Sequence, residues 1–184
     1  MRAVLSLTDK NYKAKPLIRV YIDKKGKKAK RPLGIPCMYD RAIQALYVLA
    51  LEPVAETTAD TRSFGFRKGR SCHDACEYIF MALSRKISSE WVFEDDIKGC
   101  FDHISHDWLI DNIPMDKSVL KQFLKAGFIF KRELFPIDKG TPQGGIISPI
   151  LANIALDGMQ KALYDKFHTN KLGKEDIRFK NAHK

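Results

Sequence analysis

The residues with the clearest chemical potential are three consecutive acids, Glu94, Asp95 and Asp96, within the apolar stretch 91–97. Carboxylates at the end of a buried strand lose hydration unless a cation or hydrogen-bond donors compensate them, so the cluster is a candidate for a divalent-metal site. Successive strand residues face opposite sides, so spacing alone does not choose between Asp95 and Asp96. The alternative is a set of solvated acids that end a strand or cap a helix.

A second candidate is the segment 139–156, KGTPQGGIISPILANIAL. Gly144 and Gly145 leave room for a ligand to approach the backbone, and Gln143 offers both a donor and an acceptor. Ser148 and Pro149 suit the N-cap and first turn of a helix. Taken alone, the segment is better explained as a plain loop-to-helix junction.

The elements that must position these residues follow from hydrophobic periodicity and turn residues. We expect Asp40 to cap a helix that Pro53 ends or kinks. The predicted elements, in chain order, are strands 17–22 and 31–35 around a basic turn, a helix through 43–51, a basic loop 62–71, a helix 74–85, a strand 91–97, and helices 105–113, 117–128 and 148–167. This order indicates an α+β fold.

Charge is concentrated at one end of the chain. The net charge is +10, and residues 1–31 contribute +9 of it through eleven basic and two acidic residues. Such a basic arm is a candidate surface for a polyanion such as nucleic acid. The alternative is a solvated hairpin in which lysines protect an edge strand from aggregation.

Composition excludes several classes of protein. Apolar residues make up 45% of the chain and charged residues 29%, which is typical of a globular protein. The sequence predicts no membrane span and no secretory signal, so we expect a cytoplasmic protein, bacterial or in an organellar matrix. The cysteines fit no zinc spacing and are expected to be buried, reduced thiols. His73, His103 and His106 are attributed to helix capping or core hydrogen bonds.

Five segments occur together and in order: RVYIDKKGKKAKRPLGIP, YDRAIQALYVLALEP, SFGFRKGRSCHDA, DIKGCFDHISHDWL and GTPQGGIISPILANIAL. They closely resemble successive blocks of group II intron-encoded reverse transcriptases, also called maturases. The resemblance covers about residues 12–167. It implies a right-hand polymerase with fingers over 1–90 and a partial palm over 91–184, built from the basic hairpin, helices and an incomplete antiparallel palm sheet.

The resemblance also implies roles for individual residues. Asp96, rather than Asp95, matches the catalytic metal-binding aspartate, with the Ile97 carbonyl as a further ligand in a two-Mg²⁺ site. Phe101 matches a gate that would exclude the ribose 2′-hydroxyl, although a core phenylalanine is an alternative. The remaining implied contacts are nucleotide binding by Lys30, Arg31 and Gln143, and RNA binding by Lys24, Lys25, Lys27, Lys28, Arg62, Arg67, Lys68 and Arg70. For the loop cations of this last group, ordinary solvated charge is the alternative.

The expected function is that of an RNA-directed DNA polymerase and intron maturase. It would bind intron RNA, support splicing, and use an RNA template, a DNA primer and dNTPs to copy RNA into DNA for intron mobility. The family's Tyr-Ala-Asp-Asp strand is absent from these 184 residues, so we expect a truncated palm that does not polymerise alone. Exposed palm surface would favour homo-oligomers. Alternatives are a non-catalytic RNA-binding module from a truncated or split maturase, and a defence- or CRISPR-linked reverse transcriptase.

Overall fold

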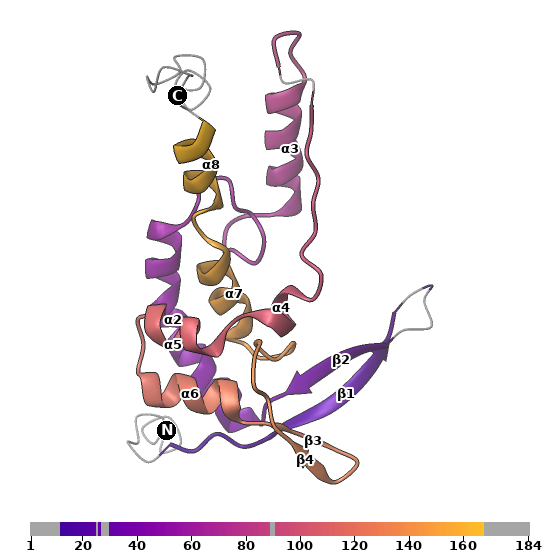
Figure 1. Cartoon of the computed structure of the whole chain (residues 1–184), viewed down its shortest axis with the longest axis vertical. Helices are drawn as coiled ribbons and strands as arrows, with labels where there is room; N and C mark the ends of the chain where they lie inside the picture. Colours follow the sequence, from indigo (N-terminus) through magenta and orange to yellow (C-terminus); the bar gives the residue numbers. More distant parts are fainter. Residues whose placement is uncertain (1–11, 25, 27–29, 89–90, 168–184) are drawn as a thin grey trace.

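The computed structural model describes residues 12–24, 26, 30–88 and 91–167 (Figure 1). Strands and helices are interspersed along the chain, as the sequence predicts for an α+β fold. The elements are β1 (Leu17–Asp23), β2 (Lys30–Ile35), α2 (Met38–Thr58), α3 (Cys72–Leu83), α4 (Cys100–His103), α5 (His106–Asn112), α6 (Lys117–Lys125), β3 (Phe128–Phe130), β4 (Glu133–Phe135), α7 (Ser148–Leu156) and α8 (Met159–Phe167).

The four strands form one sheet in the order β2-β1-β3-β4. The predicted basic hairpin is confirmed: β1 and β2 pair antiparallel, from Ile18 opposite Ile35 to Asp23 opposite Lys30. β3 joins the other edge of β1 in parallel, and β4 pairs antiparallel with β3. The described sheet is therefore mixed, whereas the sequence predicts an incomplete antiparallel palm sheet.

The β3–β4 hairpin replaces the end of a predicted helix. The sequence predicts a helix over 117–128, but α6 ends at Lys125 and Phe128 begins β3. Gly127 separates them with a φ of +70°, and a Cβ at this position would lie 2.7 Å from the Phe135 carbonyl oxygen. The left-handed turn and the close approach of β4 both require glycine here.

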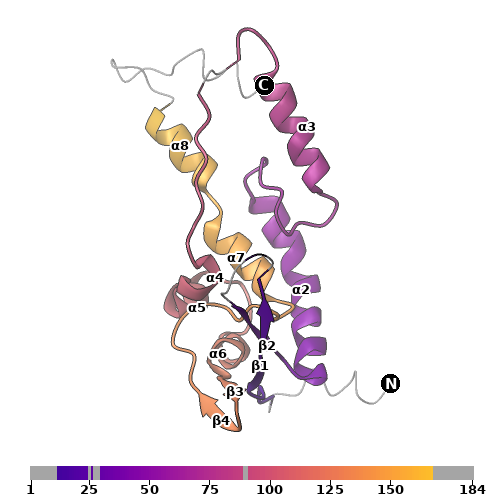
Figure 2. The same cartoon turned by 90° about the vertical axis from the view of Figure 1, so that its right-hand side faces the viewer.

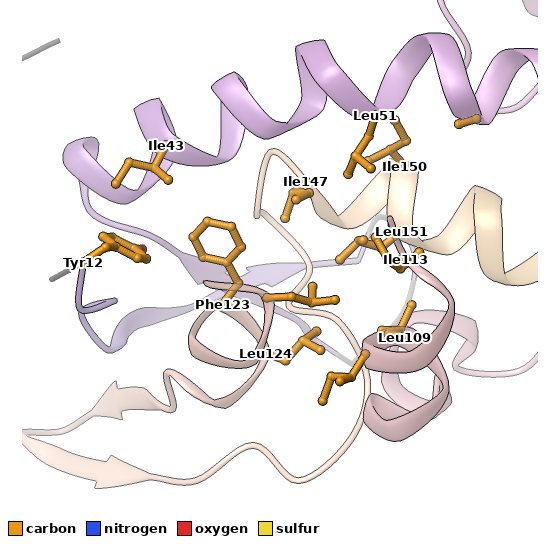
Figure 3. Packing of buried hydrophobic residues seen from close by; sticks show 13 residues of the cluster. Tyr12, Ile43, Leu51, Leu109, Ile113, Phe123, Leu124, Ile147, Ile150 and Leu151 are labelled. Atoms are coloured by element: carbon orange, nitrogen blue, oxygen red, sulfur yellow. The ribbon is translucent and has the colours of Figure 1, made fainter. Parts of the chain in front are cut away.

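The hydrophobic core lies between α2 on one side and α5, α6 and α7 on the other (Figure 3). Leu109, Leu120 and Leu124 are buried almost completely. The Tyr12 ring packs edge-on against Phe123, with 5.7 Å between the ring centroids. One core combines side chains from before and after residue 90. The predicted division into fingers (1–90) and palm (91–184) stays a prediction.

Helix α2 differs from the sequence prediction at its start and continues through Pro53. Cys37 is the N-cap, and Asp40 lies inside the first turn, where it is buried. Its carboxylate accepts hydrogen bonds from the Tyr12 hydroxyl at 2.8 Å, from the Lys15 amide at 3.1 Å and from the thiol of the N-cap Cys37 at 3.1 Å, so it ties the segment before β1 to the start of the helix. Pro53 does not end the helix, which continues to Thr58. Leu51 and Ala55, on either side of Pro53, both pack into the core.

The predicted strand over 91–97 is wrong. This segment has no regular secondary structure, and Trp91 and Phe93 are 90% and 89% exposed. A strand needs a neighbour to satisfy its backbone hydrogen bonds. None of the described strands pairs with this segment, and Figures 1 and 2 show it running clear of α3 in one view and of α8 in the other.

The last predicted helix is two helices. Residues 148–167 form α7 and α8, separated at Asp157 and Gly158, where glycine adopts a φ of +94°. Asp157 Oδ1 accepts the Asp60 amide at 2.7 Å, and Asp60 Oδ2 accepts the Gln160 amide at 3.0 Å. These reciprocal bonds secure the break. Along the described ranges, no helix combines the length and the apolar character needed to cross a membrane.

Candidate functional site

A cavity of about 600 Å³ collects the candidate residues from four separate parts of the chain. Arg31 on β2 forms one wall, and the segment containing Asp96 and Phe101 forms another. Gln143 lies in the glycine-rich loop at the start of α7, and Phe66 comes from the loop before α3. The cavity therefore exists only because segments far apart in sequence meet beside the hairpin.

The short helix α4 sets the position of Phe101. Gly99 is its N-cap, with a φ of +64° that turns the chain out of the extended segment. The Phe101 carbonyl then accepts the Thr141 amide at 2.7 Å, and Gly140 donates to the Ile104 carbonyl at 2.8 Å. A Cβ on Gly140 would lie 2.5 Å from the Phe101 carbonyl oxygen. Only glycine permits this approach, so the glycine-rich loop and the Phe101 turn are fixed to each other.

The glycine-rich loop is also fixed to β2. The Gly34 amide donates to the Gln143 carbonyl at 2.7 Å. Gly144 has a φ of +116°, and a Cβ there would lie 2.9 Å from the Gly34 carbonyl oxygen. Within the loop, the Ser148 hydroxyl donates to the Pro142 carbonyl at 2.8 Å. Ser148 therefore closes the loop from the first turn of α7, while Ile147 occupies the N-cap position that the sequence assigns to Ser148.

Two buried side chains hold this loop from behind. Gln44 Oε1 on α2 accepts the Ile146 amide at 2.8 Å. The His106 ring Nε2 lies 2.7 Å from the Gly140 carbonyl oxygen, so a ring N–H donates there. The core hydrogen bond predicted for His106 is confirmed. Sequence reasoning missed the role of Gln44, although a polar side chain among the apolar positions of a predicted helix was the available signal.

Arg31 and Lys30 are neighbours on β2 but have different surroundings. Arg31 lines the cavity together with Lys24, whereas Lys30 does not line it and its Nζ lies 3.3 Å from Asp23 Oδ1. Successive strand side chains face opposite sides of a sheet, which explains the difference. Alternation alone could have shown that both residues were not suited to one site. Lys25, Lys27 and Lys28 lie outside the described residues.

The family model for reverse transcriptase (RNA-dependent DNA polymerase) matches residues 22–179. The chain belongs to the reverse transcriptase family.

Curated relatives place this reverse transcriptase among the group II intron proteins. It is 41% identical over 166 residues to the group II intron-encoded protein LtrA of Lactococcus lactis subsp. cremoris, covering 87% of this chain and 27% of LtrA. It is 38% identical over 161 residues to a 91 kDa protein in the cob intron of Schizosaccharomyces pombe, covering 84% of this chain and 20% of that protein. The chain therefore spans about a quarter of LtrA and a fifth of the second relative.

A solved structure supports the fold. A chain of a partial Cas6-RT-Cas1–Cas2 complex superposes with a TM-score of 0.53 and 26% identity, over 91% of this chain and 29% of that chain. The mixed sheet and surrounding helices thus correspond to the fingers and partial palm of a reverse transcriptase fold.

The basic loop of this reverse transcriptase is attached to α2. Arg67 and Arg70 both bind the Glu56 carboxylate, and Lys68 Nζ lies 2.6 Å from Glu52 Oε2. Arg70 also donates to the Ser63 carbonyl at 2.7 Å. Burial alone would raise the pKa of Glu56, but the hydrogen bonds and charges of Arg70 and Arg67 lower it overall. Three of the four loop cations thus hold the loop in place, and their predicted contact with RNA stays a prediction.

The fourth loop cation, Arg62, lies over an aromatic ring. Its guanidinium carbon is 5.1 Å from the centroid of the Tyr78 ring on α3. A cation at this distance from a ring face is attracted electrostatically. Arg62 therefore contacts α3, and its predicted contact with RNA also stays a prediction.

Reverse transcriptases generally use divalent metal ions, and two predicted ligand residues of this chain lie at the cavity. Asp96 and Ile97 line the cavity, whereas Asp95 does not and its Oδ1 accepts the Asp96 amide at 2.9 Å. Asp96 is exposed, because the segment before it is not a buried strand. Across the described ranges, no group of three or more His, Cys, Asp or Glu residues is placed to hold a metal ion.

The cysteines differ from the expectation of burial. All four are free thiols, but Cys72 and Cys76 are exposed on α3, and Cys37 and Cys100 are only partly buried. The prediction that they are buried is wrong because α3 contributes no side chain to the core. The prediction that they form no disulfide framework agrees with their free state.

Proposed function

We propose that the cavity binds the incoming deoxynucleoside triphosphate of an RNA-directed DNA polymerase. The observation that carries this proposal is the meeting of Arg31, Asp96, Phe101 and Gln143 around one cavity. A planar guanidinium binds phosphate oxygens in a bidentate manner, which suits Arg31 to the triphosphate. Gln143 would contact the sugar, and the half-buried Phe101 ring would leave no room for a 2′-hydroxyl.

For the metal ions, we propose that the Asp96 carboxylate and the Ile97 carbonyl oxygen are ligands for Mg²⁺. Oxygen ligands of this kind are the ones that Mg²⁺ prefers. In phosphoryl transfer these ions neutralise the charge that develops on the phosphate oxygens. Residues 1–90 would act as fingers and residues 91–184 as part of the palm, with the cavity between them.

The nucleotide proposal is tested by comparing two adjacent cations. A dUTP labelled on its base is bound to the 184-residue chain in the presence of Mg²⁺, an RNA template and a DNA primer, and its fluorescence anisotropy is measured. We expect Arg31→Ala to weaken binding about tenfold or more, as loss of a charge-assisted contact would. Lys30→Ala, the matched control on the opposite strand face, should change it less than threefold. Equal effects, or no binding by the wild-type chain, would refute the proposal.

We further propose that a polypeptide of these 184 residues does not polymerise DNA by itself. What supports this is that Asp96 has no group of further His, Cys, Asp or Glu residues placed with it among the described residues to hold a metal ion. Primer extension on an RNA template with dNTPs and Mg²⁺ measures this. Extension should not exceed that of an Asp96→Ala control. Template-dependent synthesis above that control would show that the catalytic site is complete.

A second candidate function is binding of intron RNA through the hairpin, with splicing and intron mobility as its roles. The observation that favours it is the shape of β1 and β2, which project from the body as a basic arm carrying exposed Lys24, Lys30 and Arg31 (Figure 1). The similarity to an intron-encoded protein supports intron RNA as the partner. The loop cations Arg62, Arg67, Lys68 and Arg70 would extend this surface.

RNA binding through the arm predicts a strong dependence on salt. Neutralising each phosphate contact releases counterions, so affinity falls as salt rises. Replacing Lys24, Lys25, Lys27 and Lys28 together with alanine should reduce both the affinity for a structured intron RNA and the slope of log affinity against log salt. Binding is measured by filter retention across a salt series. An unchanged slope would exclude the hairpin as the contact surface.

A further inference from the structure

Phe66 combines an exposed ring with an unfavourable backbone conformation. Its φ is +57°, a region that bulky residues rarely occupy, and its ring is 72% exposed. The same loop has glycine at positions 65 and 69, whereas the strained position 66 carries a phenylalanine. Strained backbone of this kind is often kept at functional sites. The side chain at Phe66 therefore calls for an explanation other than stability.

The ring of Phe66 meets the ring of Phe101. Their centroids are 6.1 Å apart and their planes are nearly perpendicular, at 89°. This edge-to-face arrangement is a favourable one for aromatic pairs. Both residues line the cavity described above, so Phe66 is the aromatic neighbour of the residue that we propose as the sugar gate.

Phe66 also lines two neighbouring cavities. A second cavity of about 330 Å³ lies between α2, the basic loop and α7, and Phe66 lines it as well as the first cavity. Truncating Phe66 would therefore remove the ring that packs against Phe101 and open the space beside Phe101 to solvent. An aromatic ring that loses its packing neighbour gains freedom to change its rotamer.

The loop holds Phe66 firmly in this place. The next residue, Arg67, has a side chain that is only 4% exposed and is paired with Glu56 on α2. Arg67 Nε also donates to the Ser63 hydroxyl at 3.1 Å, across residues 64–66. These contacts of Arg67 therefore fix the backbone at Phe66.

We propose that Phe66 is a positioning residue that holds the Phe101 ring against the sugar of the incoming nucleotide, and so helps to set the preference for deoxyribose over ribose. This proposal rests on the nucleotide-binding function proposed above. The ring of Phe66 need not contact the nucleotide. It acts by restricting Phe101, which would otherwise move away and admit a 2′-hydroxyl.

The test compares two phenylalanines of the same loop. Phe64 lies two residues earlier and contacts Tyr78 on α3, with 6.1 Å between centroids, rather than Phe101. Base-labelled dUTP is bound to the 184-residue chain with Mg²⁺, RNA template and DNA primer, then displaced by unlabelled dUTP or UTP. These competitors differ in the 2′-hydroxyl, so the ratio of their dissociation constants reports sugar preference. The variants are Phe66→Ala, Phe66→Leu, Phe64→Ala and Phe101→Ala.

We expect Phe101→Ala to bring the UTP to dUTP ratio close to one. Phe66→Ala should lower the ratio about threefold to tenfold, the size of an aromatic pair contact, with dUTP affinity little changed. Phe66→Leu should recover part of the preference, and Phe64→Ala should leave it unchanged. A role for Phe66 in stability alone would weaken dUTP and UTP equally.

The possible failures are distinguishable. If Phe101→Ala abolishes the preference while Phe66→Ala does not change it, the positioning role is wrong and the proposed function stands. If the wild-type chain shows no preference, or binds neither nucleotide, the gate at Phe101 fails and the role of Phe66 fails with it. In the ligand-free chain, Phe66→Ala should also shift the aromatic NMR resonances of Phe101, whereas Phe64→Ala should not. An unshifted Phe101 would refute the contact itself.

Discussion

The two ends of the molecule are stabilised in different ways. Around α2, α5, α6 and α7, apolar side chains interlock into a buried core. At the other end lie α3 and the segment 91–97 (Figure 2). They contribute no described residue to that core, and their apolar side chains are largely exposed. The proposed nucleotide cavity lies where the packed part meets the base of the extended segment. Its floor is therefore rigid, and one wall belongs to the poorly packed end.

The largest expected effect is a difference in stability loss when a leucine is replaced by alanine at each end of the molecule. Leu109→Ala removes a side chain with 0% exposure and should lower the free energy of unfolding by about 2–5 kcal/mol. Leu83→Ala makes the same change on α3, where 38% of the residue is exposed, and should cost about 1 kcal/mol or less. Urea denaturation monitored by circular dichroism measures both. Equal losses would show that α3 is packed as tightly as the core.

A smaller, local effect should follow from the buried support of the glycine-rich loop. Gln44→Leu removes the acceptor of the Ile146 amide and should cost about 1–3 kcal/mol, because that amide loses its buried partner. Hydrogen exchange should accelerate at Ile146 and its neighbours. Gln122→Leu is the control, because Gln122 Oε1 accepts the Ala14 amide at 2.9 Å. The Gln122→Leu variant should speed exchange of the Ala14 amide and leave the Ile146 amide protected. The reverse pattern would show that Gln44 does not support the glycine-rich loop.

A pH-dependent effect should mark the packed end. Burial raises the pKa of Tyr12 above its ordinary value of 10.0, and the hydrogen bond to Asp40 and the charge of Asp40 raise it further. The folded state therefore keeps the phenol protonated while the unfolded state ionises. Stability from this group is complete below pH 10 and falls above it, by about 1.4 kcal/mol per pH unit.

The matching variant is Tyr12→Phe, whose stability should fall less steeply above pH 10 than that of the wild-type chain. A residual slope is expected because burial, aided by the charge of Asp116, also raises the pKa of Tyr47. Urea midpoints measured between pH 8 and pH 11 give both slopes. Identical slopes would mean that Tyr12 is accessible in the folded state.

The smallest effect should come from the ion pairs of the basic loop. Glu56→Gln should lower stability by no more than about 1 kcal/mol, because the Glu56 side chain is 45% exposed and a glutamine amide oxygen can still accept a hydrogen bond from the buried Arg67. The pKa of Glu56 is lowered in the fold, so its contribution is present above its ordinary value of 4.5 and is lost as pH falls below it. The difference between wild type and variant should therefore vanish in acid. A difference that grows in acid would contradict this.

The same contrast explains which elements the sequence could predict. Helix α3 forms where it was expected although its side chains are not buried, because a helix satisfies its hydrogen bonds internally and the Ser71 and Asp74 capping box fixes its start. The strand predicted over 91–97 carries an equally apolar pattern but does not form, because a strand depends on a partner. The β3 and β4 strands of three residues were too short to leave a readable alternation.

The candidate site was predictable to a similar degree. The sequence motifs identify Asp96, Phe101, Gln143 and Arg31, and the fold brings all four to one cavity. The partners of the supporting residues were not predictable, because Gln44, His106 and Phe66 act through contacts with residues 34 or more positions away. Arg67 is paired with Glu56, which limits its availability for RNA. Sequence spacing could not show that Glu56 lies beside Arg67.

Hydrogen exchange with and without nucleotide tests the central claim most directly. The 184-residue chain is bound to RNA template, DNA primer and Mg²⁺, and dUTP is then added. We predict slower exchange in three separate segments that meet at the cavity, namely the end of the hairpin near Arg31, the turn 97–102, and the loop 143–146. Helix α3 and the β3–β4 hairpin should exchange as before. Protection confined to α3 or to the β3–β4 hairpin, or no protection at all, would contradict a nucleotide site at this cavity.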